Sequence, residues 1–82
     1  MPRYKCDTFR PVNDTNMYDA VMTFAKRLAR RKYGKSGVVY ILRLDSWNST
    51  SGTYEAFIAR RVREFGQVTY RGANHHLQVM EA

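Results

Sequence analysis

An apolar stripe at helical spacing constrains this fold more than any other feature of the sequence. Between residues 17 and 28, apolar side chains recur every three or four positions. That spacing predicts an amphipathic α-helix, because residues three and four apart lie on the same side of a helix. The helix must bury this side against other elements of the fold. The stripe consists of Met17, Ala20, Val21, Phe24 and Leu28.

The residues around the stripe predict where the helix begins and ends. A side-chain oxygen of Asp14, Thr15 or Asn16 can cap the first turn. Gly34 can adopt the left-handed conformation that commonly closes a helix. The expected helix therefore starts close to residue 17 and stops before Gly34.

Two other segments predict strands on either side of this helix. Near the N-terminus, Tyr4, Cys6 and Thr8 fall on one side of an alternating pattern, which predicts a half-buried strand that ends at Pro11. Residues 38–44 are rich in β-branched and aromatic side chains. Because both faces of this second segment are largely apolar, we expect it to be a central strand.

Residues 53–65 fit a helix better than a strand. Glu, Ala and Arg dominate the positions between the apolar residues, and Gly66 offers a C-terminal stop. Arg61 is the one charged residue inside the apolar face of that helix. Read as a strand, the segment would instead pair with residues 38–47 across a Ser-Gly turn. For Trp47, before that turn, we expect a core position, and an exposed interface anchor is the alternative. The apolar face of the helix would hold Tyr54, Phe57, Ile58, Val62 and Phe65.

A β-hairpin is expected at the end of the chain. Residues 67–71 and 75–79 flank Gly72-Ala73-Asn74, a three-residue turn that contains glycine. Residues 1–82 then form a single small α+β domain with the element order β-α-β-α-β-β. The predicted architecture is an antiparallel or mixed sheet with one or two helices packed on one face.

Composition limits the class of protein. The chain has 82 residues, enough for one modest core. Its single cysteine, Cys6, excludes an intramolecular disulfide, and no apolar run suits a signal peptide or a membrane span. We therefore expect a cytoplasmic protein with no membrane partner, and the sequence leaves its oligomeric state open.

Positive charge is concentrated in one short segment. Six of the ten residues from 26 to 35 are basic, and no acidic residue lies between Asp19 and Asp45. The whole chain carries a net charge of +7. Such crowding costs free energy through self-repulsion, so a partner that carries negative charge is expected.

We therefore predict a small basic module that binds a polyanion, RNA or DNA, chiefly through phosphates. Three of the cations, Lys26, Arg27 and Arg30, share the solvent side of the first helix, opposite the apolar stripe. Tyr33 and Tyr40 are close in sequence and can stack on unpaired bases. The predicted nucleic-acid contacts are Lys26, Arg27, Arg30, Arg31, Lys35, Arg60 and Arg63.

A protein-interaction module is the alternative. The same basic surface suits an acidic face of another protein. A chain of this size can also act as an inhibitor that blocks a surface of a larger nucleoprotein machine, as a small protein encoded by a phage or mobile element would. No metal site or cofactor is expected, because one cysteine and two adjacent histidines give no zinc spacing. No catalytic group is expected either, because the acidic residues are scattered singly and give no paired carboxylates or Ser-His-Asp arrangement. His75 and His76 would also point to opposite faces of a strand.

A local stretch near the C-terminus resembles HicA-type toxins, which are small basic mRNA-cleaving proteins with a double-stranded-RNA-binding-domain fold. The resemblance covers about 25 residues: a helix that passes through Phe65-Gly66 into the strand at 68–71, followed by residues 72–77. It implies a catalytic role for His75 or His76. In that family the segment opens the chain, whereas here it ends the chain.

Overall fold

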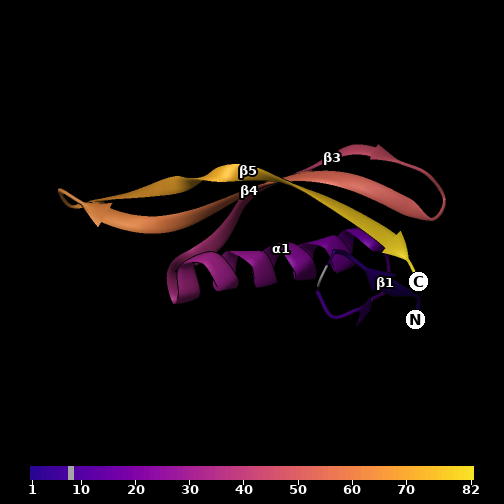
Figure 1. Ribbon diagram of the computed structural model, residues 1–82. Coiled ribbons are helices and arrows are strands. Elements are labelled where there is room, and N and C mark those ends of the chain that lie inside the picture. The colour runs from indigo at the N-terminus through magenta and orange to yellow at the C-terminus, as the bar shows by residue number, and fades with distance from the viewer. Residues whose placement is uncertain (8) are drawn as a thin grey trace.

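The computed structural model describes residues 1–7 and 9–82 as a five-stranded antiparallel sheet with one α-helix against one face (Figure 1). The strands lie side by side in the order β2-β1-β5-β4-β3. The predicted α+β class and the covered single face are therefore confirmed, but the predicted element order is not. The elements are β1 (Arg3–Lys5), β2 (Val12–Asn13), α1 (Met17–Tyr33), a 3-10 turn η1 (Gly34–Ser36), β3 (Gly37–Trp47), β4 (Ser51–Glu64) and β5 (Gln67–Glu81).

The helix α1 has the predicted bounds. At its start, the Asn16 side-chain oxygen accepts a hydrogen bond of 2.9 Å from the backbone N–H of Asp19. At its end, Gly34 has a φ of 62° and donates its N–H to the carbonyl of Arg30. Both caps satisfy backbone groups that a helix end leaves free.

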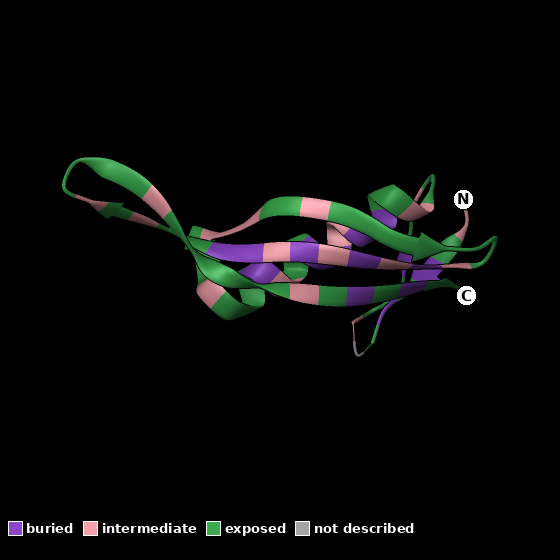
Figure 2. Cartoon of the chain, turned by 90° about the horizontal axis from the view of Figure 1, so that it is seen from above, coloured by how far each residue is buried: buried purple, intermediate pink, exposed green. Residues whose placement is uncertain are grey.

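The core lies between α1 and the sheet. The buried side of α1 includes Phe24 and three alanines, whose small side chains allow the helix to approach the strands closely. Buried and more exposed positions alternate over residues 51–58 of β4 and 75–80 of β5, in the part of the sheet that lies over α1 (Figure 2). The residues of β4 and β5 that face this helix in the core are Tyr54, Ala56, Ile58, Leu77 and Val79.

The predicted second helix at residues 53–65 is wrong, because this segment forms most of β4. The strand pairs with β5 along its whole length on one side, and with β3 from Gly52 to Arg60 on the other. These two ladders override the helical propensity of Glu, Ala and Arg. The strand also explains Arg61, which disturbed the apolar face of the expected helix and now stands at an exposed strand position.

The hairpin between the last two strands turns at Phe65-Gly66 and not at residues 72–74. Phe65 and Gly66 have φ values of 51° and 76°, as a two-residue hairpin loop with both φ positive requires. Gly72 lies inside β5, where a Cβ atom would be 1.9 Å from the carbonyl oxygen of Ile58. A glycine is therefore needed at position 72 because β4 passes close to the backbone there, and not because the chain turns, as the sequence predicted.

Residues 38–44 belong to an edge strand and not to the predicted central strand. β3 pairs only with β4 among the described strands. Val39 and Leu42 of β3 pack against the core. Tyr40 and Ile41 of the same strand are exposed. Trp47, expected in the core, is 71% exposed at the end of the same strand.

The N-terminal strand is shorter than predicted. Tyr4 and Cys6 are buried, in agreement with the alternating pattern, but β1 ends at Lys5. Thr8 lies outside the described residues. A short strand that was not predicted, β2, pairs with β1 and forms the other edge of the sheet.

The hairpin of β4 and β5 extends past the C-terminal end of α1 (Figure 1). We call residues 60–71 the arm. The arm gives the molecule its elongated shape, with principal dimensions of 46 × 22 × 20 Å. The end of the molecule that carries the arm also carries the basic end of the helix.

Candidate nucleic-acid interface

The C-terminal half of α1 forms one side of an open hollow of about 440 Å³ at the arm end of the molecule. We call it the basic hollow. Four of the seven predicted nucleic-acid contacts surround it: Lys26, Arg27, Arg30 and Lys35. Thr23, Gly34 and Gly37 complete its lining.

The local fold explains why these four cations meet. The apolar stripe of α1 faces the sheet, so Lys26, Arg27 and Arg30 are left on exposed parts of the helix. Gly34 then ends the helix, and η1 brings Lys35 back beside it. After η1 the chain passes close to α1 at Gly37. A Cβ atom there would be 2.2 Å from the carbonyl oxygen of Ala29, so only glycine fits this position.

The charges of the basic hollow are not neutralised by the protein. None of the ion pairs within the described part of the chain includes Lys26, Arg27, Arg30 or Lys35. The Arg27 guanidinium donates a hydrogen bond of 3.1 Å to the carbonyl of Arg10, which fixes its position without cancelling its charge. The hollow is therefore an electropositive concave surface.

The other three predicted contacts lie outside the basic hollow. Arg31 is directed away from it, with its guanidinium 4.4 Å from the centre of the Phe9 ring. Arg60 is the strand partner of Gly37, which lines the hollow, so Arg60 is placed beside its rim. Arg63 stands further along the arm. The structure thus gathers four of the predicted residues, places a fifth next to them and separates two.

The arm adds to the positive charge at this end. Its exposed arginines are Arg60, Arg61, Arg63 and Arg71. Glu64 neutralises only Arg71, through a contact of 2.8 Å between Nη2 and Oε1. Arg60 and Glu64, whose four-residue spacing would let them pair on a helix, form no ion pair with each other because they lie on a strand.

Sequence reasoning missed a second hollow, which lies on the open face of the sheet, the face away from α1. It measures about 370 Å³, and we call it the aromatic hollow. The Tyr40 ring stacks on the Tyr70 ring, with 4.7 Å between the centroids and 25° between the planes. Phe57 meets Tyr40 edge to face at 6.0 Å. The lining residues are Tyr40, Ile41, Phe57, Thr69 and Tyr70.

Of the two tyrosines expected to be available for stacking, only one lies on this surface. Tyr40 is 55% exposed, while Tyr33 packs against the core. Tyr70 and Phe57 could not be assigned to the same site from the sequence, because residues 53–65 were expected to be helical. Their grouping depends on the register between β3, β4 and β5.

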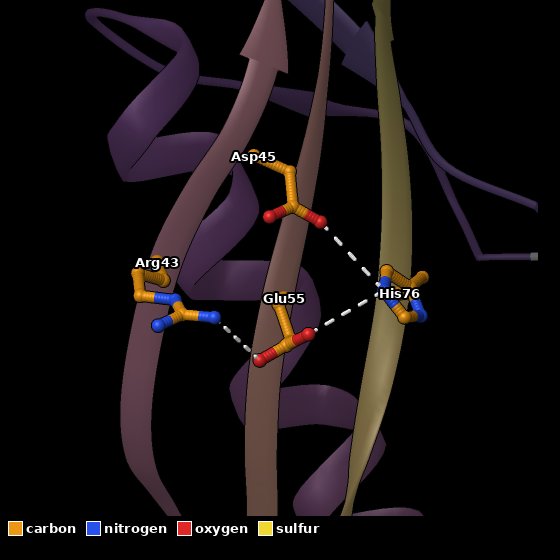
Figure 3. Close-up of polar contacts among 4 residues, drawn as sticks. All are labelled: Arg43, Asp45, Glu55 and His76. Carbon is orange, nitrogen blue, oxygen red and sulfur yellow. Dashed lines mark hydrogen bonds and ion pairs between the residues drawn. The ribbon is translucent and has the colours of Figure 1, made fainter.

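A polar cluster occupies another part of the open face (Figure 3). His76 Nε2 lies 3.6 Å from an oxygen of Asp45 and 3.5 Å from Oε2 of Glu55, and Arg43 contacts Oε1 of Glu55 at 3.1 Å. The ligand atoms of Asp45, Glu55 and His76 lie within 4.8 Å of one another, close enough to hold a metal ion. The neighbouring Arg43 pairs with Glu55 and opposes a cation there. Contacts among the four side chains themselves thus account for the arrangement.

Among the described residues, the two histidines and the cysteine do not lie together. His75 and His76 lie on opposite faces of β5, opposite Ala56 and Glu55 respectively, as their adjacency predicts. Burial, with a smaller effect of Lys32, lowers the pKa of His75. Burial raises the pKa of the Cys6 thiol to about 11, so it is protonated at neutral pH. The helix on which the resemblance to HicA-type toxins depends is a strand.

Comparison with protein-family models, curated proteins and solved structures finds no match to this chain. Function must therefore be inferred from the surfaces described above. In the described part of the chain, no helix combines the length and the apolar character needed to cross a membrane.

Proposed function

We propose that this protein binds a nucleic acid and contacts its phosphates through the basic hollow. The observation that carries the proposal is the convergence of four cations on one concave surface without a carboxylate partner among the described residues. Phosphate oxygens would supply the missing negative charge. A cytoplasmic location, expected from the sequence, belongs to the same proposal.

The helix dipole does not explain this charge cluster by itself. Cations in the last turn of a helix are stabilised by the carbonyl groups at that end. Arg30, Arg31 and Lys32 stand in the last turn of α1, but Lys26 precedes it and Lys35 follows it. The extra cations raise the repulsion within the cluster, which a bound phosphate backbone would relieve.

The expected mode of binding has little sequence preference. Contacts to phosphates fix the position of a protein on a nucleic acid, whereas contacts to base edges select a sequence. The polar atoms of the basic hollow come chiefly from lysine and arginine, which suit phosphates. Counterion release would then supply most of the affinity.

A matched pair of double variants tests the proposal. Lys26→Ala/Arg30→Ala removes two charges from the basic hollow, while Arg3→Ala/Lys5→Ala removes two exposed charges from β1, at the other end of the molecule. Arg27 is left in place because it bonds to the backbone of Arg10. Fluorescence anisotropy with a labelled oligonucleotide at low salt measures the affinity, and urea unfolding checks that both variants are folded.

The first variant should bind much more weakly than the wild type, and the second should bind almost as well as the wild type. Equal losses in the two variants would mean that net charge, and not the basic hollow, governs binding. Unchanged affinity in the first variant would remove the hollow as the site.

A protein partner is the second candidate, and the edge strand favours it. β3 is an edge strand of eleven residues whose outer side has no partner strand among the described ones, and it exposes the apolar side chains Tyr40, Ile41, Leu44 and Trp47. Exposed edges can pair with a strand of another protein, although two bulges interrupt the regular pairing of β3. An acidic polypeptide such as polyglutamate distinguishes the candidates: an occluding module would bind it at low salt without binding oligonucleotides.

A further inference from the structure

The aromatic hollow has features of a binding surface. Tyr40 and Tyr70 are 55% and 39% exposed, although both rings are large and apolar over most of their area. Together with Phe57 they form a partly exposed aromatic surface on the side of the sheet away from α1. A planar aromatic group is the ligand that such rings bind best, because offset stacking adds to the burial of apolar surface.

Positive charge borders this aromatic surface. Arg61 is the strand partner of Tyr70, and Arg63 follows it along the same side of β4. Both arginines are exposed, and neither takes part in an ion pair within the described chain. Aromatic rings beside free guanidinium groups suit a ligand that carries planar bases and phosphates together.

A third hollow continues the basic hollow as far as the edge strand β3. It lies between α1 and β3, with Met22, Lys26, Ala29, Gly37, Val38 and Val39 as its lining. It shares Lys26 and Gly37 with the basic hollow, and Val39 directly precedes Tyr40 of the aromatic hollow. Because β3 is the edge strand, no described strand lies between this third hollow and the open face on the other side of β3.

We propose that the aromatic hollow binds an unpaired base of a single-stranded nucleic acid, whose neighbouring phosphates occupy the basic hollow. This inference rests on the proposed function and specifies the form of its ligand. In a duplex the bases stack on each other inside the helix, so their faces cannot reach Tyr40 and Tyr70. A single strand can turn a base outward and bend around the edge of β3.

The test compares single and double strands of the same length. Labelled oligo-dT and oligo-U of about ten nucleotides are titrated by fluorescence anisotropy at low salt, together with a mixed-sequence duplex of about ten base pairs. The variants are Tyr40→Ala and Tyr70→Ala, and the control is Tyr18→Ala, which removes an exposed tyrosine from α1. Tyr70→Phe keeps the aromatic ring and shows whether stacking or the hydroxyl is required.

The wild type should bind the single strands more tightly than the duplex. Tyr40→Ala and Tyr70→Ala should each weaken single-strand binding by about 5- to 150-fold, the range found for loss of one stacking residue. Duplex binding should change by less than about twofold. Tyr18→Ala and Tyr70→Phe should retain the single-strand affinity of the wild type.

Two results would overturn this inference, and they differ from a failure of the proposed function. If the wild type binds duplex as tightly as single strands, or if both alanine variants keep their single-strand affinity, the aromatic hollow does not bind bases. The basic hollow would remain a phosphate site in either case. If the wild type binds neither form at low salt, the proposed function itself is wrong.

Discussion

Salt should weaken nucleic-acid binding in proportion to the number of cations in the basic hollow. Lys26, Arg27, Arg30 and Lys35 line it. Each phosphate that a cation neutralises on a single strand contributes about −0.7 to the slope of log affinity against log salt, so four contacts predict about −2.8. Raising the salt from about 50 to about 200 mM should then reduce the affinity about 50-fold.

The double variant Lys26→Ala/Arg30→Ala changes this slope by an amount that the structure specifies. Two of the four lining cations remain, so the expected slope is about −1.4. The same increase in salt should then reduce the affinity only about sevenfold. Arg3→Ala/Lys5→Ala should keep the slope of the wild type, since neither residue lines the hollow.

The assay is a series of anisotropy titrations with one labelled single strand at four or more salt concentrations. The slope is more informative than a single affinity because it counts ionic contacts and does not depend on stacking. A wild-type slope close to zero would refute the role of phosphate contacts. A slope that is the same in the wild type and in Lys26→Ala/Arg30→Ala would refute the placement of those contacts in the basic hollow.

Three further predictions concern the fold. Gly72→Ala should lower the free energy of unfolding in urea by about 1–3 kcal/mol, because the new Cβ atom would overlap the Ile58 carbonyl. The control Asn74→Ala, on the same strand, should change this free energy by less than about 0.5 kcal/mol. Phe65→Asn should raise the free energy of unfolding by about 0.5–1 kcal/mol, because asparagine tolerates the positive φ at this position of the β4–β5 turn. A loss of stability in this variant would contradict the reasoning. His75 has a lowered pKa in the folded protein, so the unfolded chain binds its proton first as the pH falls below about 6.5. Stability should therefore decrease as the pH falls through that range, and His75→Leu should reduce the decrease; an identical pH profile in the variant would refute it.

Local sequence signals predicted the parts of the fold that depend on neighbouring residues. The stripe of α1, its cap at Asn16 and its stop at Gly34 all act within a few residues of each other. For the same reason the four cations around the basic hollow could be grouped in advance. They belong to one helix end and the turn that follows it.

The parts that were wrong depend on contacts between distant strands. Residues 53–65 have helical propensity, yet nearly all of them belong to β4, because β5 supplies backbone partners along the strand and β3 supplies them as far as Arg60. Glycine is common in turns, but Gly72 lies inside β5, where the absence of a side chain lets the backbone of β4 come close to β5. The grouping of Tyr40 with Phe57 and Tyr70 follows from strand register, which the sequence does not display.

An NMR titration tests the central claim most directly, because it locates the bound strand residue by residue. A single strand of about ten nucleotides is added to the isotope-labelled protein at low salt, and the backbone amide signals are followed. We predict shifts across residues 26–37 and at Tyr40, Phe57 and Tyr70, with little change in β1. Unchanged spectra, or shifts confined to β1 and the start of α1, would contradict nucleic-acid binding at this interface.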